Sequence, residues 1–154
     1  MQNRKAELIE TLLPKDTNGY GNIFGGVIMS IMDKTAGVAC WRYSKNRVVT
    51  ACAQRITFHT PINMGEVVYS RASIVYVGRC SMEVEVEVFD EDPDTGIRRR
   101  CCDGFLTFVS LGKDNRPAPV PQVLATSEEE QQREREANAR RGRRLASRPP
   151  RPSR

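Results

Sequence analysis

The spacing of apolar residues changes once along the chain, and this change constrains the fold more than any other feature. From residue 25 or 26 to about Tyr43, apolar residues recur at intervals of three and four, which indicates a helix with few polar positions. After Asn46 they recur at intervals of two, in four runs at residues 48–58, 66–77, 82–89 and 98–111. We therefore expect a long, mostly buried helix followed by four strands.

Turn-forming residues separate the four runs in the manner of an antiparallel sheet. Pro61 and Gly65 bracket the first connection, residues 78–80 suit a tight hairpin, and the sequence EDPDTG at 91–96 suits a turn. Residues 6–13 fit either a strand or a helix by pattern, and Pro14 ends the element; of the two we expect a short strand. The sequence thus predicts an α+β domain in which the helix packs on one face of an antiparallel sheet.

The C-terminal segment differs in composition from the rest of the chain. The chain has 154 residues and a net charge of +5, and the positive excess lies from Lys113 onward, in a segment rich in proline, glutamate and arginine. Such a segment buries too little apolar surface to offset its ordering entropy. We expect a folded domain at residues 6–121 and a basic, disordered tail at 122–154. Within the tail, the residues from Ser127 to 141 suit a lone polar helix.

The five cysteines show no spacing typical of a metal site. They are Cys40, Cys52, Cys80, Cys101 and Cys102. With no Cys-x-x-Cys motif or Cys/His cluster, the pattern predicts reduced thiols and no bound metal. The N-terminus has no signal pattern, and the most apolar stretch, residues 27–41, is interrupted by Ser30, Asp33 and Lys34. We therefore expect no membrane span and a cytoplasmic protein.

Asp33 is a carboxylate within a helix that is otherwise nearly apolar. An unpaired charge in an apolar setting is costly, so its presence calls for a reason. On a helical wheel it shares a stripe of small or polar residues with Gly26, Ser30 and Gly37, where another molecule could approach the backbone. At the start of the helix, Gly25 and Gly26 present unpaired N–H groups that favour negative charge, as an oxyanion site requires.

A purely structural interpretation accounts for the same residues. Asp33 could form an ion pair with an arginine such as Arg55, and the two glycines could allow close packing at a turn. Residue spacing alone does not separate this interpretation from a catalytic one.

Four blocks of sequence, in order, resemble the YciA-type and cytosolic (brain-type) acyl-CoA hydrolases. They are DTNGYGNIFGGVIMSIMDKTAG at 16–37, RVVTACAQRITFHTPINMGEVV at 47–68, VGRCSMEVEVEVF at 77–89 and GFLTFVSL at 104–111. The resemblance covers residues 6–121 and implies a hot-dog fold, in which an antiparallel sheet wraps a long central helix. It also implies that acyl-CoA is hydrolysed to a free carboxylic acid and CoA, with CoA as part of the substrate and no separate cofactor.

The same resemblance implies roles for individual residues. Asp33 is the catalytic carboxylate, acting as a general base on water or as a nucleophile, and Asn18 from a partner protomer is the second catalytic residue. The Gly26 N–H, with Gly25 beside it, polarises the thioester carbonyl. The family builds this site at a dimer interface, so a homodimer and a trimer of dimers are expected. Phe24 stands where other hot-dog proteins carry a histidine, as it does in the YciA-type members.

Two further positions bear on substrate binding and reaction class. In similar proteins the hairpin formed here by Gly78, Arg79 and Ser81 lies near CoA, and Arg79 could meet a phosphate or be only solvated. The single histidine, His59, follows the predicted helix, whereas hot-dog dehydratases place theirs before it. This favours hydrolysis over dehydration.

Two other functions are compatible with the sequence. The first is a non-catalytic module that binds CoA or acyl-CoA on the same fold. The second is a nucleic-acid adaptor acting through the basic tail, although the basic residues are not spread over a folded face.

Overall fold

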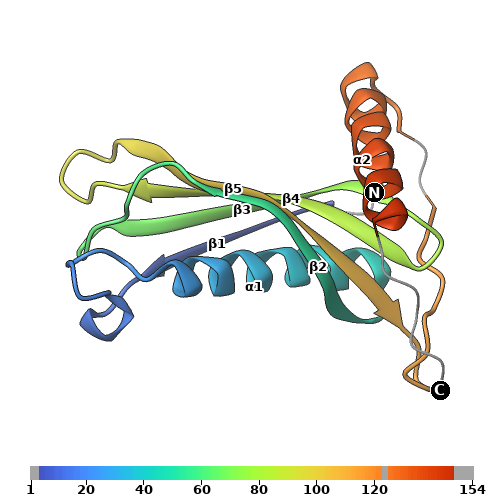
Figure 1. Ribbon diagram of the computed structural model, residues 1–154, viewed down its shortest axis with the longest axis horizontal. Coiled ribbons are helices and arrows are strands. Elements are labelled where there is room, and N and C mark those ends of the chain that lie inside the picture. The colour runs from blue at the N-terminus through green and yellow to red at the C-terminus, as the bar shows by residue number, and fades with distance from the viewer. Residues whose placement is uncertain (1–3, 123–124, 148–154) are drawn as a thin grey trace. The chain divides into compact units, whose positions relative to one another are not determined.

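The computed structural model describes residues 4–122 and 125–147. Along the chain, its elements are β1 (Lys5–Thr11), a short 3-10 helix η1 (Pro14–Asp16), α1 (Gly25–Ser44), β2 (Arg47–Phe58), β3 (Val67–Val77), β4 (Ser81–Glu91), β5 (Arg98–Leu111) and α2 (Glu128–Ala146). Figure 1 shows α1 running along one face of the sheet. The predicted helix, the four strands after it and the short strand before it are all confirmed.

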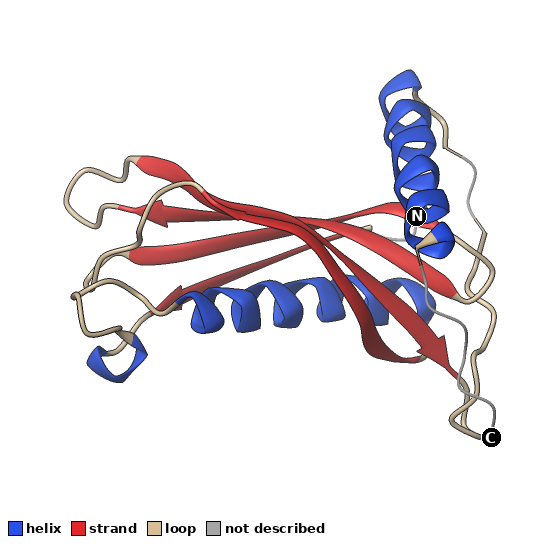
Figure 2. Cartoon of the chain, viewed as in Figure 1, coloured by secondary structure: helices blue, strands red, loops and turns tan. Residues whose placement is uncertain are grey.

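The five strands form one antiparallel sheet with the order β1-β3-β4-β5-β2. The apolar face of β4 points toward α1. The side chains on this face, at Met82, Val84, Val86 and Val88, are fully buried. Figure 2 shows the sheet lying along α1, with strand β2 crossing this helix. This arrangement confirms the predicted α+β class and hot-dog fold.

Helix α1 is less buried than its sequence predicts. One side packs on the sheet through residues such as Ile31, Met32 and Ala36, which are at most 1% exposed. The other side leaves Met29 43% and Trp41 60% exposed. The reason is that one sheet covers only one side of a helix, so the second apolar side stays open in a single copy of the chain.

Strand β2 forms one edge of the sheet and hydrogen-bonds only to β5 among the described strands. Its pairing shifts register between Thr50 and Cys52 and again between Gln54 and Thr57. Within the second shift, Arg55 has a φ of 53°, a left-handed conformation that non-glycine residues adopt rarely. These bulges bend β2 around α1, while its outer edge stays free of a described partner.

The proline-rich segment after β5 packs along the end of the domain. Val120 is 4% exposed, and its N–H donates to Arg79 O at the β3–β4 hairpin. Tyr43, at the end of α1, donates from its hydroxyl to Pro121 O over 2.9 Å, and Gln122 donates from Nε2 to Gly78 O over 3.1 Å. The segment 117–122 therefore connects the hairpin to the C-terminal end of α1.

The chain divides into two compact units, residues 1–122 and 123–154. In the second unit, the predicted polar helix is present as α2, and the Ser127 side chain accepts from Glu130 N as a helix cap. The division at residue 121 into a hot-dog domain and a disordered tail stays a prediction.

Candidate active site

The N-terminus of α1 presents unpaired backbone donors. Phe24 is the N-cap residue and supplies no capping side chain, so the N–H groups of Gly25 and Gly26 have no acceptor among the described residues. Gly26 is exposed, and a Cβ at this position would lie 2.5 Å from the Phe24 ring. Glycine at this position therefore leaves an open approach to two N–H groups at the positive end of the helix dipole.

Asn18 lies in the loop that leads into α1. Its Oδ1 accepts from the N–H groups of Tyr20 at 2.9 Å and Asn22 at 3.2 Å, and its own N–H donates to Asn22 O at 2.7 Å. The loop is joined to the helix where Phe24 N–H donates to Asp16 O at 2.9 Å. These bonds fix the Asn18 amide by its oxygen, and Nδ2 donates to no residue in the described part of the chain.

Asp33 lies on the open side of α1, beside β2. Its carboxylate is half-buried, and Oδ1 accepts a 2.6 Å hydrogen bond from Thr50 Oγ1. The described residues place no cation within ion-pair distance of Asp33, so the structural alternative of a pair with Arg55 is wrong. The carboxylate is oriented by a neutral donor and keeps Oδ2 available, as a group that must accept a proton requires.

Asp33 and Gly26 of one protomer are too far apart to act on the same atom. Both lie on α1, and at a rise of about 1.5 Å per residue they are about 10 Å apart along its axis. Groups that act on one reacting carbon must approach it to about 3 Å. Asn18 lies at the Gly26 end of the helix, so it too is separated from Asp33 of the same copy.

The hairpin residues Gly78, Arg79 and Ser81 lie at the opposite end of α1 from Gly26. Gly78 N–H donates to Ser81 O at 2.7 Å, which closes the hairpin, and the Arg79 side chain is exposed. Segment 117–122 links this hairpin to the last turn of α1, about 30 Å along the helix from its first residue. Within one protomer, the predicted CoA-binding residues and the predicted oxyanion site are therefore not brought together.

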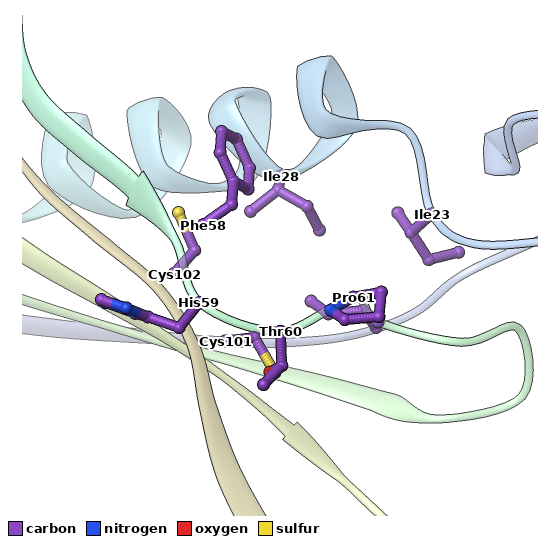
Figure 3. Close-up of a pocket in the computed structure, with 9 residues that line it drawn as sticks. Ile23, Ile28, Phe58, His59, Thr60, Pro61, Cys101 and Cys102 are labelled. Atoms are coloured by element: carbon purple, nitrogen blue, oxygen red, sulfur yellow. The ribbon is translucent and has the colours of Figure 1, made fainter.

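A cavity of about 300 Å³ lies beside the N-terminal turn of α1. It is lined by Ile23, Ile28, Phe58, His59, Thr60, Pro61, Ile62, Cys101 and Cys102. Figure 3 shows Ile28 and Phe58 on one side of it, with Thr60 and Pro61 on the other. A Cβ added to Gly25 would lie 3.4 Å from the Phe58 ring, so the cavity adjoins the unpaired N–H groups.

The imidazole of His59 points away from the cavity in Figure 3. Its Nε2 pairs with Asp103, and Arg100 contacts the same carboxylate at 3.1 Å. The histidine is thus held in a charged cluster on the sheet, as expected of a structural residue. Among the described residues, no group of three or more His, Cys, Asp or Glu side chains could hold a metal ion.

Sequence reasoning missed Thr50 and the cavity. Thr50 sits in an ordinary strand pattern, and only the packing of β2 against α1 brings its hydroxyl to Asp33. The cavity residues come from four separate segments, and the paired glycines at the start of α1 were the only local signal beside it.

The family model described as the thioesterase superfamily matches residues 20–97. The chain belongs to this superfamily. YkhA of Bacillus subtilis, named as an uncharacterized acyl-CoA thioester hydrolase, is 36% identical over 129 residues, which is 82% of this chain and 75% of that protein. The rat cytosolic acyl coenzyme A thioester hydrolase is 36% identical over 139 residues. This match covers 88% of the chain and 36% of the rat protein, so the chain spans about a third of that relative.

Solved structures agree with the sequence matches. An acyl-CoA hydrolase from Staphylococcus aureus, in complex with butyryl coenzyme A, coenzyme A and coenzyme A disulfide, is 30% identical with a TM-score of 0.84 over 95% of this chain and 89% of that chain. It has also been solved with alanine in place of an aspartate, a threonine or an asparagine. An apo-hexameric acyl-CoA thioesterase is 33% identical, with a TM-score of 0.86 over 95% of this chain and 96% of the other. The family predicted from the sequence is confirmed.

Proposed function

We propose that this protein hydrolyses acyl-CoA to a carboxylic acid and CoA at a site shared by two copies of the chain. The observation that carries the proposal is the Asp33 carboxylate, oriented by Thr50 on the open side of α1 with Oδ2 uncommitted. It is supported by the superfamily membership and by relatives named as acyl-CoA thioester hydrolases.

The free edge of β2 supplies the geometry for a shared site. Along β2, Thr50 marks the Asp33 end and Phe58, beside Gly25, marks the oxyanion end. If two β2 edges pair antiparallel about a two-fold axis near the middle of the strand, Thr50 of one copy lies opposite the Phe58 end of the other. This pairing brings Asp33 of one protomer toward Gly26 and Asn18 of its partner, which a single protomer keeps apart.

The same pairing accounts for exposed apolar surface. Val49 and Phe58 on β2 are 44% and 51% exposed, and Met29 on α1 is 43% exposed. An unpaired edge with apolar neighbours is a surface that soluble proteins cover. The homodimer covers it, and a trimer of dimers is proposed by analogy with the hexameric neighbour.

Each chemical step has a group suited to it. The Gly26 N–H, at the positive end of α1, donates to the thioester oxygen as negative charge develops there. Asp33 Oδ2 accepts a proton from the attacking water, or attacks the carbonyl carbon itself as a nucleophile. Asn18 Nδ2 is the free donor that can hold the water or the substrate oxygen. The leaving thiolate is a weak base, so no strong general acid is needed.

The hydrolase from Staphylococcus aureus supports the choice of residues. The asparagine, the aspartate and the threonine replaced by alanine in that enzyme have the same spacing along its chain as Asn18, Asp33 and Thr50 in this one. Three residue types at matching intervals, in a structure of the same fold, support a common site.

CoA binding is proposed for Gly78, Arg79 and Ser81 of another copy of the chain. In an antiparallel dimer the C-terminal end of one α1 lies toward the N-terminal end of the other, which is the end where the thioester binds. The exposed Arg79 guanidinium is then free to meet a phosphate of CoA.

The test measures thiol release from purified protein with a series of acyl-CoAs. Asp33→Asn should lower kcat at least about a hundredfold, because it removes the proton acceptor while keeping the shape. Asp94→Asn is the matched control, because Asp94 is exposed in the β4–β5 turn. Full turnover in Asp33→Asn would contradict the assigned role. Binding of acyl-CoA without thiol release from the unaltered protein would instead identify a non-catalytic module.

A further inference from the structure

We infer that the cavity beside α1 holds the acyl chain and limits it to about ten carbons, with Thr60 and Ile62 setting the limit. The inference rests on the proposed hydrolase function and adds its substrate class. The proposed position of the thioester carbonyl adjoins the cavity: a Cβ added to Gly25 would lie 3.4 Å from the Phe58 ring, and Ile28, one turn further along α1, lines the cavity.

The cavity has an open rim and a closed floor. Phe58 is 51% exposed, and Thr60 and Pro61, which face it across the cavity in Figure 3, are exposed as well. At the floor, Ile62 is 3% exposed and Cys102 is 1% exposed. A chain entering beside Phe58 therefore meets the buried side chains of Ile62 and Cys102.

The floor is apolar and uncharged. Burial raises the pKa of the Cys102 thiol to about 12 and raises that of Cys101 above its ordinary value. Both thiols are thus protonated at neutral pH and behave as small apolar groups. The one other ionisable side chain among the lining residues is His59, whose ring points away toward Asp103. Such a wall suits an alkyl chain and disfavours a charged group.

The volume gives the length limit. At about 30 Å³ for each water-sized group, a cavity of about 300 Å³ holds about ten non-hydrogen atoms. An octanoyl or decanoyl chain fits this space, whereas a palmitoyl chain exceeds it. Each methylene buried in the cavity should tighten binding about fourfold until the space is full.

The experiment measures dissociation constants by titration calorimetry for butyryl-, octanoyl- and palmitoyl-CoA. The protein is the full-length chain carrying Asp33→Asn, so that substrates persist, and kcat/KM is measured in parallel with Asp33 intact. Octanoyl-CoA should bind at least tenfold more tightly than butyryl-CoA, and palmitoyl-CoA no more tightly than octanoyl-CoA. Affinity that keeps rising to palmitoyl-CoA, or that ignores chain length, overturns the inference.

Two substitutions test the cavity itself. Thr60→Phe, at the exposed rim, should fill it and lower the octanoyl-to-butyryl affinity ratio at least fivefold, whereas Ile62→Ala should extend the limit toward longer chains. Thr11→Phe, on an exposed β1 position outside the cavity, is the matched control. An unchanged ratio in Thr60→Phe overturns the inference even if Ile62→Ala does not fold. Absent thiol release with a normal chain-length profile of binding contradicts the hydrolase function alone.

Discussion

Thr50 Oγ1 donates a 2.6 Å hydrogen bond to Oδ1 of Asp33, and this bond joins the edge of the sheet to the central helix. It fixes the direction in which the carboxylate faces. It also links the position of Asp33 to that of β2, the strand proposed to form the dimer.

Replacing Thr50 should impair catalysis through the position of Asp33. Thr50→Val keeps the shape of the side chain but removes the donor, so kcat should fall about ten- to a hundredfold with a smaller change in KM. Thr50→Ser retains the hydroxyl and should recover most of the rate. Steady-state kinetics on octanoyl-CoA check this, and equal rates for Thr50→Val and the unaltered protein would show that the bond is only structural.

Two inactive variants should restore activity when mixed. In a dimer of one Asn18→Ala chain and one Asp33→Asn chain, one of the two shared sites has both native residues. After co-refolding in equal amounts, statistical pairing predicts about a quarter of full activity. Each variant refolded alone serves as the control. If the mixture stays as inactive as its components, Asn18 and Asp33 do not act across an interface.

Gly26→Ala should lower activity while changing the stability of the fold little. Alanine favours a helix over glycine by about 1 kcal/mol, so the melting temperature should not fall greatly. The new methyl group would lie 2.5 Å from the Phe24 ring, so the ring must move. We expect it to move over the helix terminus and cover the N–H groups there. We expect kcat/KM to drop at least tenfold. Gly19→Ala, where a Cβ meets nothing within 4 Å, is the control; full activity of Gly26→Ala would exclude Gly26 from the oxyanion site.

The buried thiols should contribute to stability below their raised pKa values. Cys102 has a pKa of about 12 in the folded protein against an ordinary value of 9.0, because burial disfavours the thiolate. Its contribution is therefore complete below pH 9.0 and is lost as the pH rises toward 12. Denaturant unfolding at a series of alkaline pH values should show this decline, and Cys102→Ala should make it smaller. A decline of equal size in the variant would assign it to other groups.

Two truncations should distinguish the tail from the segment that packs on the domain. Ending the chain after Gln122 keeps Val120 and the hydrogen bond from Tyr43 to Pro121, so the melting temperature and kcat/KM should change little. Ending it after Arg116 removes both, at a cost of about 2 to 4 kcal/mol in unfolding free energy. Urea unfolding measures the difference. If ending the chain after Gln122 instead raises KM in a way that depends on salt, α2 takes part in binding anionic CoA.

Much of the fold follows from local patterns in the sequence. The alternation of Val84, Val86 and Val88 with glutamates predicts a half-buried strand, and β4 has that face against α1. Ser127 predicts the start of α2, because a helix cap depends on residues adjacent in sequence. The cytoplasmic location stays a prediction; none of the described helices is long and apolar enough to cross a membrane.

Only part of the candidate site could be predicted from local patterns in the sequence. Gly25 and Gly26 can be assigned from helix physics, because the first N–H groups of any helix lack acceptors. The surroundings of Asp33 could not be predicted: an arginine partner was one of two interpretations that the sequence left open, and the fold instead supplies Thr50 as a hydrogen-bond donor. A hydrogen bond between a helix and a strand that crosses it depends on the angle at which they pack.

The sequence by itself determined the order of elements, the hot-dog family and the unpaired donors at the start of α1, because these depend on neighbouring residues and on several motifs in order. Tertiary structure alone decided which residues meet. It placed Thr50 of β2 against the Asp33 carboxylate and enclosed a cavity beside Gly25. Distances between residues remote in the chain are set by packing of whole elements, and no local pattern encodes them.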